Sequence, residues 1–155
     1  MTQTIQGTFP VYYFDFKIGT KGLASTESDM VSVAEMESLG FGIEGGTEEW
    51  TPMTTRGWAN ATMTGKKFSV EVKGKRCIGD AGNDYIAGIA WKDGLDCDTK
   101  ATIDFPDGSK LEFDCVVDVT NVGGGESTNV APLEFKLIGK GKPTFTPAPT
   151  TGGSE

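Results

Sequence analysis

The chain has 155 residues, of which 22 are glycine, and a formal net charge of −8 with no histidine. The absence of histidine removes the usual general base and the commonest metal ligand, and the excess of acid disfavours nonspecific binding to nucleic acid phosphates. Because no run of 18 apolar residues occurs and no basic segment precedes an apolar one at the N-terminus, we expect neither a membrane span nor a signal peptide.

The N-terminal third contains one strand signal followed by a glycine-rich stretch. In residues 9–18, one set of side chains alternates with another, Tyr12, Phe14, Phe16 and Ile18 against Tyr13, Asp15 and Lys17. This period of two predicts a β-strand. Residues 19–55 are acidic and punctuated by glycine, with few apolar side chains to bury. We expect this segment to be mobile in the isolated subunit.

The central part, residues 57–138, contains the regular core. Residues 58–62 and 68–72 read as two strands around a turn near residues 64–66. Residues 80–91 form the only plausible helix, which Asp80 can cap. Tyr85, Ile86, Ile89 and Ala90 fall on one stripe of that helix, suited to packing against a sheet.

Residues 101–138 are the most regular stretch and predict two strands joined by a hairpin, followed by a third strand. Apolar side chains occupy the odd positions from Leu111 to Val119, while Glu112, Asp114 and Asp118 point the other way. The Phe-Pro-Asp-Gly sequence at residues 105–108 predicts a turn, because proline presets its φ and glycine accepts a positive one. Glycines 123–125 end the pairing, and alternation resumes at residues 133–137.

The three cysteines and the C-terminal segment carry no sign of chemistry. Cys77, Cys97 and Cys115 are odd in number and widely spaced, so we expect buried or half-buried free thiols of a reducing compartment, with a disulfide or a reactive thiol as alternatives. Residues 143–155 are rich in Pro, Thr and Gly and should form a flexible C-terminal arm. Phe145 is the only large apolar side chain after Ile138, and we expect it to anchor this arm on a neighbouring subunit.

Charge is distributed unevenly along the chain. Seven acids and no base lie between Lys21 and Arg56, and five bases follow closely: Lys66, Lys67, Lys73, Lys75 and Arg76. Both groups could be ordinary solvated faces. Alternatively, the basic group of one subunit faces the acidic group of another, or the acids line a passage along which a polyanion must move without binding.

Several motifs in a specific order give the chain a resemblance to the major tail tube proteins of long-tailed bacteriophages with non-contractile tails. They are Glu-Glu-Trp-Thr-Pro at residues 48–52, Gly-Trp at 57–58, Thr-Gly-Lys at 64–66, Gly-Asp at 79–80, Asn-Asp-Tyr-Ile at 83–86, Phe-Pro-Asp-Gly at 105–108, Val-Gly-Gly-Gly at 122–125 and Gly-Lys-Pro at 141–143. Many relatives carry an immunoglobulin-like domain after the core, whereas a short Pro/Thr/Gly segment follows the core here. We therefore do not expect a surface-decorating function.

The resemblance implies a mainly β protein: an antiparallel β-sandwich or barrel-like tail tube fold with one flanking α-helix and a long hairpin. Residues 1–142 would form a single tail tube domain. Six subunits would close an inner β-barrel, and stacked rings would form the hollow tube through which the genome passes. Implied partners are other copies of the chain and the tape measure, tail terminator and distal tail proteins. Genomic DNA would cross the lumen without specific binding, and no membrane is involved. The protein would reside in the virion after assembly in the bacterial host cytoplasm.

The resemblance places the long hairpin within the acidic stretch, which makes Glu35, Glu37, Glu44, Glu48 and Glu49 candidates for the lumen. Glu35 and Glu37 share a face if their strand is regular, whereas Glu48 and Glu49 cannot share one. Lys66, Lys67, Lys73, Lys75 and Arg76 are candidates for inter-subunit contacts. Trp50 and Trp58 are expected in core or interface packing.

No catalytic, cofactor or metal site is expected. Asp80 and Asp84 look like paired carboxylates, but capping explains Asp80, exposure explains Asp84, and no base or nucleophile accompanies them. The sequence therefore favours a structural assembly protein over an enzyme. The alternative function is a non-enzymatic β-sandwich binding module, for carbohydrate as an example, which would present a surface row of aromatic side chains.

Overall fold

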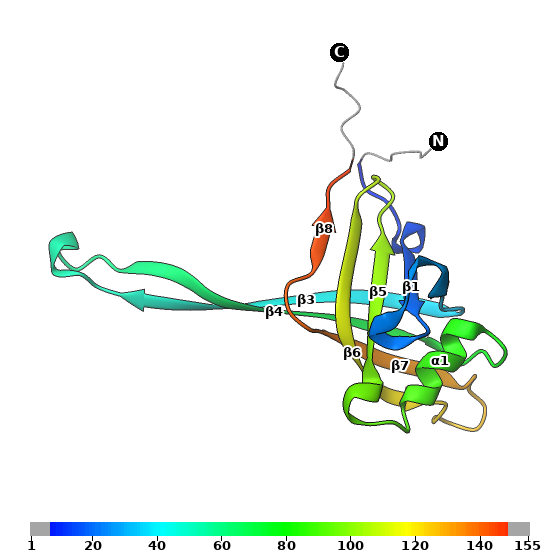
Figure 1. The fold of residues 1–155 in the computed structure, drawn as a ribbon. Coiled ribbons are helices and arrows are strands. Elements are labelled where there is room, and N and C mark those ends of the chain that lie inside the picture. Colours follow the sequence, from blue (N-terminus) through cyan, green and yellow to red (C-terminus); the bar gives the residue numbers. More distant parts are fainter. Residues whose placement is uncertain (1–6, 149–155) are drawn as a thin grey trace, which may run out of the picture.

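The computed structural model describes residues 7–148, which form a mainly β structure with one α-helix (Figure 1). The strands are β1 (Asp15–Gly19), β2 (Met30–Ser32), β3 (Met36–Trp50), β4 (Asn60–Lys75), β5 (Asp98–Asp104), β6 (Lys110–Val122), β7 (Pro132–Gly139) and β8 (Thr144–Thr146), and the helix is α1 (Ala81–Ile89). Short 3-10 turns occur at Val11–Tyr13, Gly22–Ala24, Glu27–Asp29, Met53–Thr55 and Gly94–Cys97.

All eight strands belong to one antiparallel sheet that bends into two layers. The strand order is β2-β1-β5-β6-β7-β4-β3, and β8 pairs with β6. Strand β6 belongs to both layers, because β5 and β8 pair with its first half and β7 pairs with its second half. The layer containing β1 and β5 crosses in front of the layer containing β3, β4 and β7 (Figure 1). This arrangement confirms the expected sandwich-like fold with one flanking helix.

The core lies between the layers and is filled by the alternating apolar positions. Leu133, Phe135 and Leu137 of β7 are fully buried. Aromatic rings connect the layers: the ring centroids of Phe68 and Phe113 are 5.0 Å apart, in an edge-to-face geometry. Helix α1 buries Ile86 and Ile89, and the Asp80 carboxylate accepts a hydrogen bond from the backbone N–H of Asn83 at 3.0 Å. The predicted helix, its cap and its apolar stripe are confirmed.

Two strand predictions need correction. Of the strand predicted at residues 9–18, only the part from Asp15 is a paired strand, because β5, with which β1 pairs, ends at Asp104, opposite Asp15. Residues 11–13 form a 3-10 turn instead. The two strands predicted at residues 58–62 and 68–72 are one continuous strand, β4. The residues read as a turn, 64–66, instead pass through a register shift in the β3–β4 ladder between Gly46 and Thr47.

The hairpin from β5 to β6 matches its prediction in detail. Leu111, Phe113, Cys115 and Val117 are buried, and Glu112, Asp114 and Asp118 are exposed. Gly108 adopts a φ of 96° in the turn, a value that favours glycine.

All three cysteines are free; Cys115 is buried, and Cys77 and Cys97 are partly buried. Burial raises the pKa of the Cys115 thiol to about 12. Within residues 7–148, no helix combines the length and apolar character needed to cross a bilayer.

Candidate functional site

Strands β3 and β4 form a long hairpin whose outer part projects from the body of the protein (Figure 1). Strand β7 pairs with β4 only from Ser69 to Lys75, so the segment from Ile43 to Phe68, here called the arm, is two-stranded. Almost all arm side chains are exposed, including Ile43 at 67% and Met63 at 51%. An isolated two-stranded hairpin is at best marginally stable in water, so the arm is suited to pairing with another chain.

The free edge of β3 is the longest unpaired edge in the described sheet. Strand β3 has 15 residues, pairs with β4 on one side and ends the strand order on the other. Residues 117–122 of β6 likewise pair with β7 alone, because β5 begins opposite Val116. The layer formed by β3, β4, β7 and the second half of β6 therefore has strand edges available at both sides. Exposed edges promote association with other strands, and a ring of subunits would cover them.

The hairpin register assigns side chains to two faces. Phe41 and Ile43 lie opposite Val70 and Phe68, on the side of the core, whereas Glu44 lies opposite Lys67 on the other side. Beyond the register shift, Glu48 lies opposite Thr62, and Glu49 lies opposite Ala61. Since alternate residues of β3 point to opposite faces, Glu44 and Glu48 share the face away from the core, and Glu49 points to the core side.

The side of this layer that faces away from the core carries alternating charges, and we call it the polar face. Its charged residues are Glu44, Glu48, Lys67, Glu71, Lys73, Lys75, Asp118, Glu134 and Lys136. Neighbouring strands place opposite charges side by side: Lys136 lies opposite both Glu71 and Asp118, and Lys73 lies opposite Glu134. The Lys73 ammonium is 3.7 Å from the Glu71 carboxylate on the same strand. Acids outnumber lysines on this face, but each lysine has acidic neighbours.

The other two acidic candidates lie at the base of the hairpin. Glu35 precedes β3 and has a φ of 63°, and Glu37 lies at a register shift between Met36 and Ser38. The regular strand on which their shared face depends is therefore not present. The Lys75 ammonium is 3.2 Å from the Glu37 carboxylate. Glu35 and Glu37 thus lie away from the arm, where the sequence grouped them with Glu44, Glu48 and Glu49.

The basic candidates also divide into two groups. Lys66 and Lys67 are exposed on the arm, whereas Lys73, Lys75 and Arg76 have ionic partners within the chain. An Arg76 guanidinium nitrogen is 2.8 Å from the Asp84 carboxylate and 2.9 Å from the Asn83 side-chain oxygen. The hydrogen bond from Arg76 lowers the pKa of Asp84.

Asn83, which sequence reasoning did not single out, links the helix to the base of the hairpin. Its fully buried side chain donates to the backbone carbonyls of Ala34 and Lys75 and accepts from the backbone N–H of Cys77. Asp80 also accepts from the backbone N–H of Ala34. These contacts explain Asp80 and Asn83 as structural residues. No cluster suited to a metal ion occurs among the residues that the structure describes.

The aromatic candidates are exposed in the single subunit. Trp50 is 43% and Trp58 is 79% exposed, so neither belongs to the core. Phe145 lies in β8, which pairs with residues 110–112 of β6 in its own chain, and its side chain is 57% exposed. These residues therefore remain candidates for contacts between chains.

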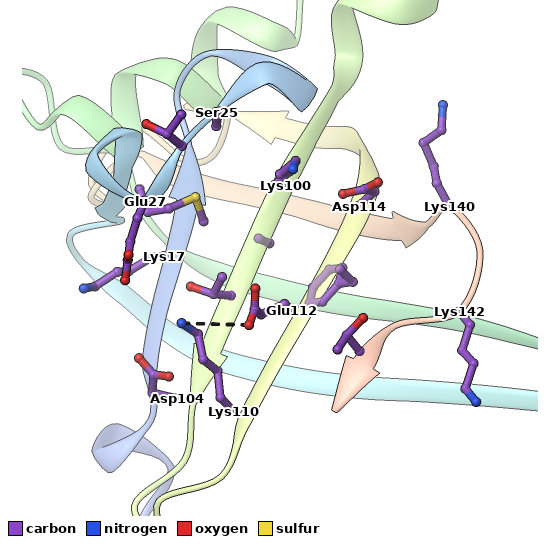
Figure 2. A pocket seen from close by; sticks show the side chains of 16 residues that line it. Lys17, Ser25, Glu27, Lys100, Asp104, Lys110, Glu112, Asp114, Lys140 and Lys142 are labelled. Carbon is purple, nitrogen blue, oxygen red and sulfur yellow. Dashed lines mark ion pairs between the residues drawn. The ribbon is translucent and has the colours of Figure 1, made fainter. Parts of the chain in front are cut away.

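A second surface is a polar hollow of about 630 Å³ on the outer side of β1, β5 and β6 (Figure 2). Lysines and acids alternate along its floor: Lys100 lies opposite Asp114, and Lys110 lies opposite Asp104. Lys140 at its edge is 2.7 Å from the Asp98 carboxylate. Because both signs of charge line it, the hollow offers no field of one sign to attract an ion.

Comparison with solved structures shows the same fold in tail assemblies. The chain is similar to a chain in the tail of an empty gene transfer agent particle, refined with C6 symmetry, at a TM-score of 0.69 and 13% identity, covering 90% of this chain and 100% of that one. It is also similar to a chain of the native gene transfer agent virion, at a TM-score of 0.67 and 13% identity, with the same coverage of both chains. A third similar structure is a chain in the cap that terminates the tube of an anti-feeding prophage, at a TM-score of 0.60 and 13% identity, covering 94% of this chain and 95% of that one.

These similarities confirm the resemblance to tail tube proteins at the level of fold. No protein-family model matches the chain, and no curated protein is significantly similar to it in sequence.

Proposed function

We propose that this chain is the structural subunit of a hollow, non-contractile phage-type tail tube, in which stacked hexameric rings surround a channel for DNA. The observation that carries the proposal is the unpartnered edge of β3, continued into an arm with no layer packed against it. Pairing of this edge with residues 117–122 of a neighbouring β6 would close the layer into a barrel, as barrel closure removes free edges. Tail terminator, tape measure and distal tail proteins are the proposed further partners, and the host cytoplasm is the proposed place of assembly.

The geometry of such a ring determines which face would line the channel. The body of each subunit packs on the core side of the layer formed by β3, β4, β7 and β6. If this layer formed a barrel with the bodies inside, they would fill the channel, so they must lie outside. The polar face would then face the lumen. Its lysines have acidic neighbours on adjacent strands, and this arrangement would leave few free cations for a passing phosphate backbone.

Electron microscopy of the concentrated, purified chain tests the assembly proposal. We expect hollow filaments of uniform width, because head-to-tail stacking of rings grows without limit. A protein that remains monomeric at all concentrations and salt conditions would contradict the proposal.

The lumen assignment has a separate test. Changing Glu44 and Glu48 together to lysine should leave tubes intact and slow the passage of DNA, most clearly at low salt. The same change at Glu27 and Glu112, which line the polar hollow on the outer side of β1, β5 and β6, is the matched control. Equal DNA passage through both kinds of tube would contradict the assignment.

The C-terminal anchor remains a proposal that a truncation can test. A chain ending at Gly141 lacks Phe145 and the strand β8 that covers part of β6. We expect a folded subunit that forms tubes poorly. Normal tube yield would exclude an anchoring role for Phe145.

A further inference from the structure

An apolar groove of about 460 Å³ lies where the two ends of the sheet approach each other without pairing. Aromatic and aliphatic side chains line it, namely Tyr12, Phe14, Phe16, Met36, Leu39 and Val72. Tyr12 at its edge is 79% exposed. Asp15, Glu37 and Ser38 also line the groove, so two carboxylates accompany its apolar surface.

The groove exists because the sheet does not close on itself. Strand β2, at one end of the order, has three residues, and β3, at the other end, pairs with β4 alone. Between them the edge of the core remains open to solvent near the start of β3. Exposed apolar surfaces of this kind commonly mark interfaces.

The tip of the arm, residues 51–59 between β3 and β4, carries apolar and basic side chains that match the apolar lining and the two acids of the groove. Met53 is 93% exposed and Trp58 is 79% exposed, and Arg56 lies between them in the sequence. The tip is a compact turn: the Thr55 hydroxyl oxygen is 2.9 Å from the Pro52 carbonyl oxygen and 2.7 Å from that of Trp58. Tryptophan and arginine are the residue types most often found as energetic centres of protein interfaces.

We propose that the arm tip of one subunit seats in this groove of a second copy. Trp58 and Met53 would cover the apolar lining, and Arg56 would pair with Asp15 or Glu37. This inference rests on the self-assembly proposed above and names its docking site.

The tip of a chain cannot occupy the groove of the same chain. The groove is lined by the first residues of β3 and the tip follows its last residue, and strand β3 spans about 50 Å at roughly 3.3 Å per residue. Docking must therefore join different chains. Because donor and acceptor surfaces differ, each subunit can give its tip to one neighbour and receive the tip of another, which produces a head-to-tail array.

The charges in the groove remain available to an incoming arginine. The present partners of the two acids are lysines on exposed surfaces: Lys17 is 3.8 Å from Asp15, and Lys75 is 3.2 Å from Glu37. Exposed pairs of this kind contribute little to stability. A guanidinium can bind a carboxylate through two parallel hydrogen bonds, which a lysine cannot do.

Disulfide cross-linking between two variants tests the docking directly. Cys77 and Cys97 are first replaced by serine, and Met53→Cys and Ser38→Cys are then made in separate chains. We expect mild oxidation of the assembled mixture to give a cross-linked dimer containing one chain of each variant. The control pairs Met53→Cys with Ser127→Cys, which lies in the exposed loop before β7, and should give little dimer.

Electron microscopy of the same samples separates the two proposals. Tubes without the cross-link between positions 53 and 38, or with as much cross-link in the control pair, would overturn the docking site and leave tube formation standing. Absence of both tubes and cross-linked dimers would overturn both.

A charge exchange gives a second test of the same contact. Arg56→Glu should raise the protein concentration needed for assembly by roughly tenfold or more, and adding Asp15→Lys to the same chain should recover part of that loss. If neither Asp15→Lys nor Glu37→Lys recovers any assembly of the Arg56→Glu variant, the proposed pairing is wrong.

Discussion

Replacement of Trp58 by alanine should weaken assembly while leaving the folded subunit unchanged. Trp58 belongs to the tip of the arm and is 79% exposed, and it is not part of the buried core. Substitutions at such surface positions typically change the free energy of unfolding by less than about 0.5 kcal/mol. The effect of the change should therefore fall on the contact between chains.

The expected size of the effect follows from the exposed area. A tryptophan buries about 150–250 Å² in a well-packed contact. With 79% of its surface exposed in the free subunit, about 120–200 Å² remains to be covered, which at about 25 cal/mol per Å² gives an upper limit of about 3–5 kcal/mol. Alanine retains part of this contact, so we expect a loss of about 2–4 kcal/mol. That loss corresponds to roughly a 30-fold to 1000-fold increase in the critical concentration for assembly.

Sedimentation of assembled protein over a range of total concentrations measures the critical concentration, and urea unfolding of the dilute subunit measures its stability. Trp91→Ala is the matched control, because Trp91 is 81% exposed but follows helix α1, away from the arm. Assembly of Trp58→Ala at the wild-type critical concentration would refute this role of the arm tip. An equal loss in Trp91→Ala would show that the effect is not specific to the arm.

Three further predictions concern the folded subunit. Gly88→Ala should stabilise helix α1 by about 1 kcal/mol, or about 2–4 °C in a thermal melt, because the added Cβ meets open space. Gly82→Ala should destabilise the subunit, because its Cβ would collide with the backbone oxygen of Ser32. Stabilisation by both substitutions would contradict this packing. The pKa of Asp84 is lower in the folded chain than its ordinary value of 3.8. The ionised Asp84 carboxylate therefore stabilises the fold above pH 3.8, and this stabilisation is lost as the pH falls through the pKa of the folded state. Asp84→Asn should be less stable than wild type at neutral pH, and a difference that persists in strong acid would refute this. Iodoacetamide at mildly alkaline pH should modify Cys77 in the folded subunit and Cys115 only after unfolding, because burial raises the pKa of Cys115 to about 12. Mass spectrometry that shows labelling of Cys115 before unfolding would contradict this.

The sequence alone determined the features that depend on neighbouring residues. The period of two in residues 111–119 predicts which side chains of β6 are buried, because a strand sends successive side chains to opposite faces. The turn at residues 105–108 and the Asp80 cap were predictable because each depends on the conformational limits of a few adjacent residues. The order of the motifs also predicted the fold of tail tube proteins and the region of the long hairpin.

The tertiary structure decided the features that depend on strand register. Residues 64–66 read as a turn, but pairing with β3 carries β4 through them with a shift opposite Gly46. That pairing assigns Glu44 and Glu48 to the face away from the core and Glu49 to the core side, and the shift near Met36 removes the shared face expected for Glu35 and Glu37. A sequence pattern cannot locate such shifts, because one residue more or less in the pairing moves every later side chain to the other face.

The groove beside β3 was also outside the reach of the sequence. Its lining comes from the segment around Phe14 and Phe16, from the start of β3 and from Val72 of β4, segments that are far apart in the chain. Each of these apolar residues is consistent with an ordinary core position when read along the chain. Only the folding of the sheet into two layers whose ends do not pair leaves this part of the core open, because closure depends on strand order and strand length rather than on local pattern.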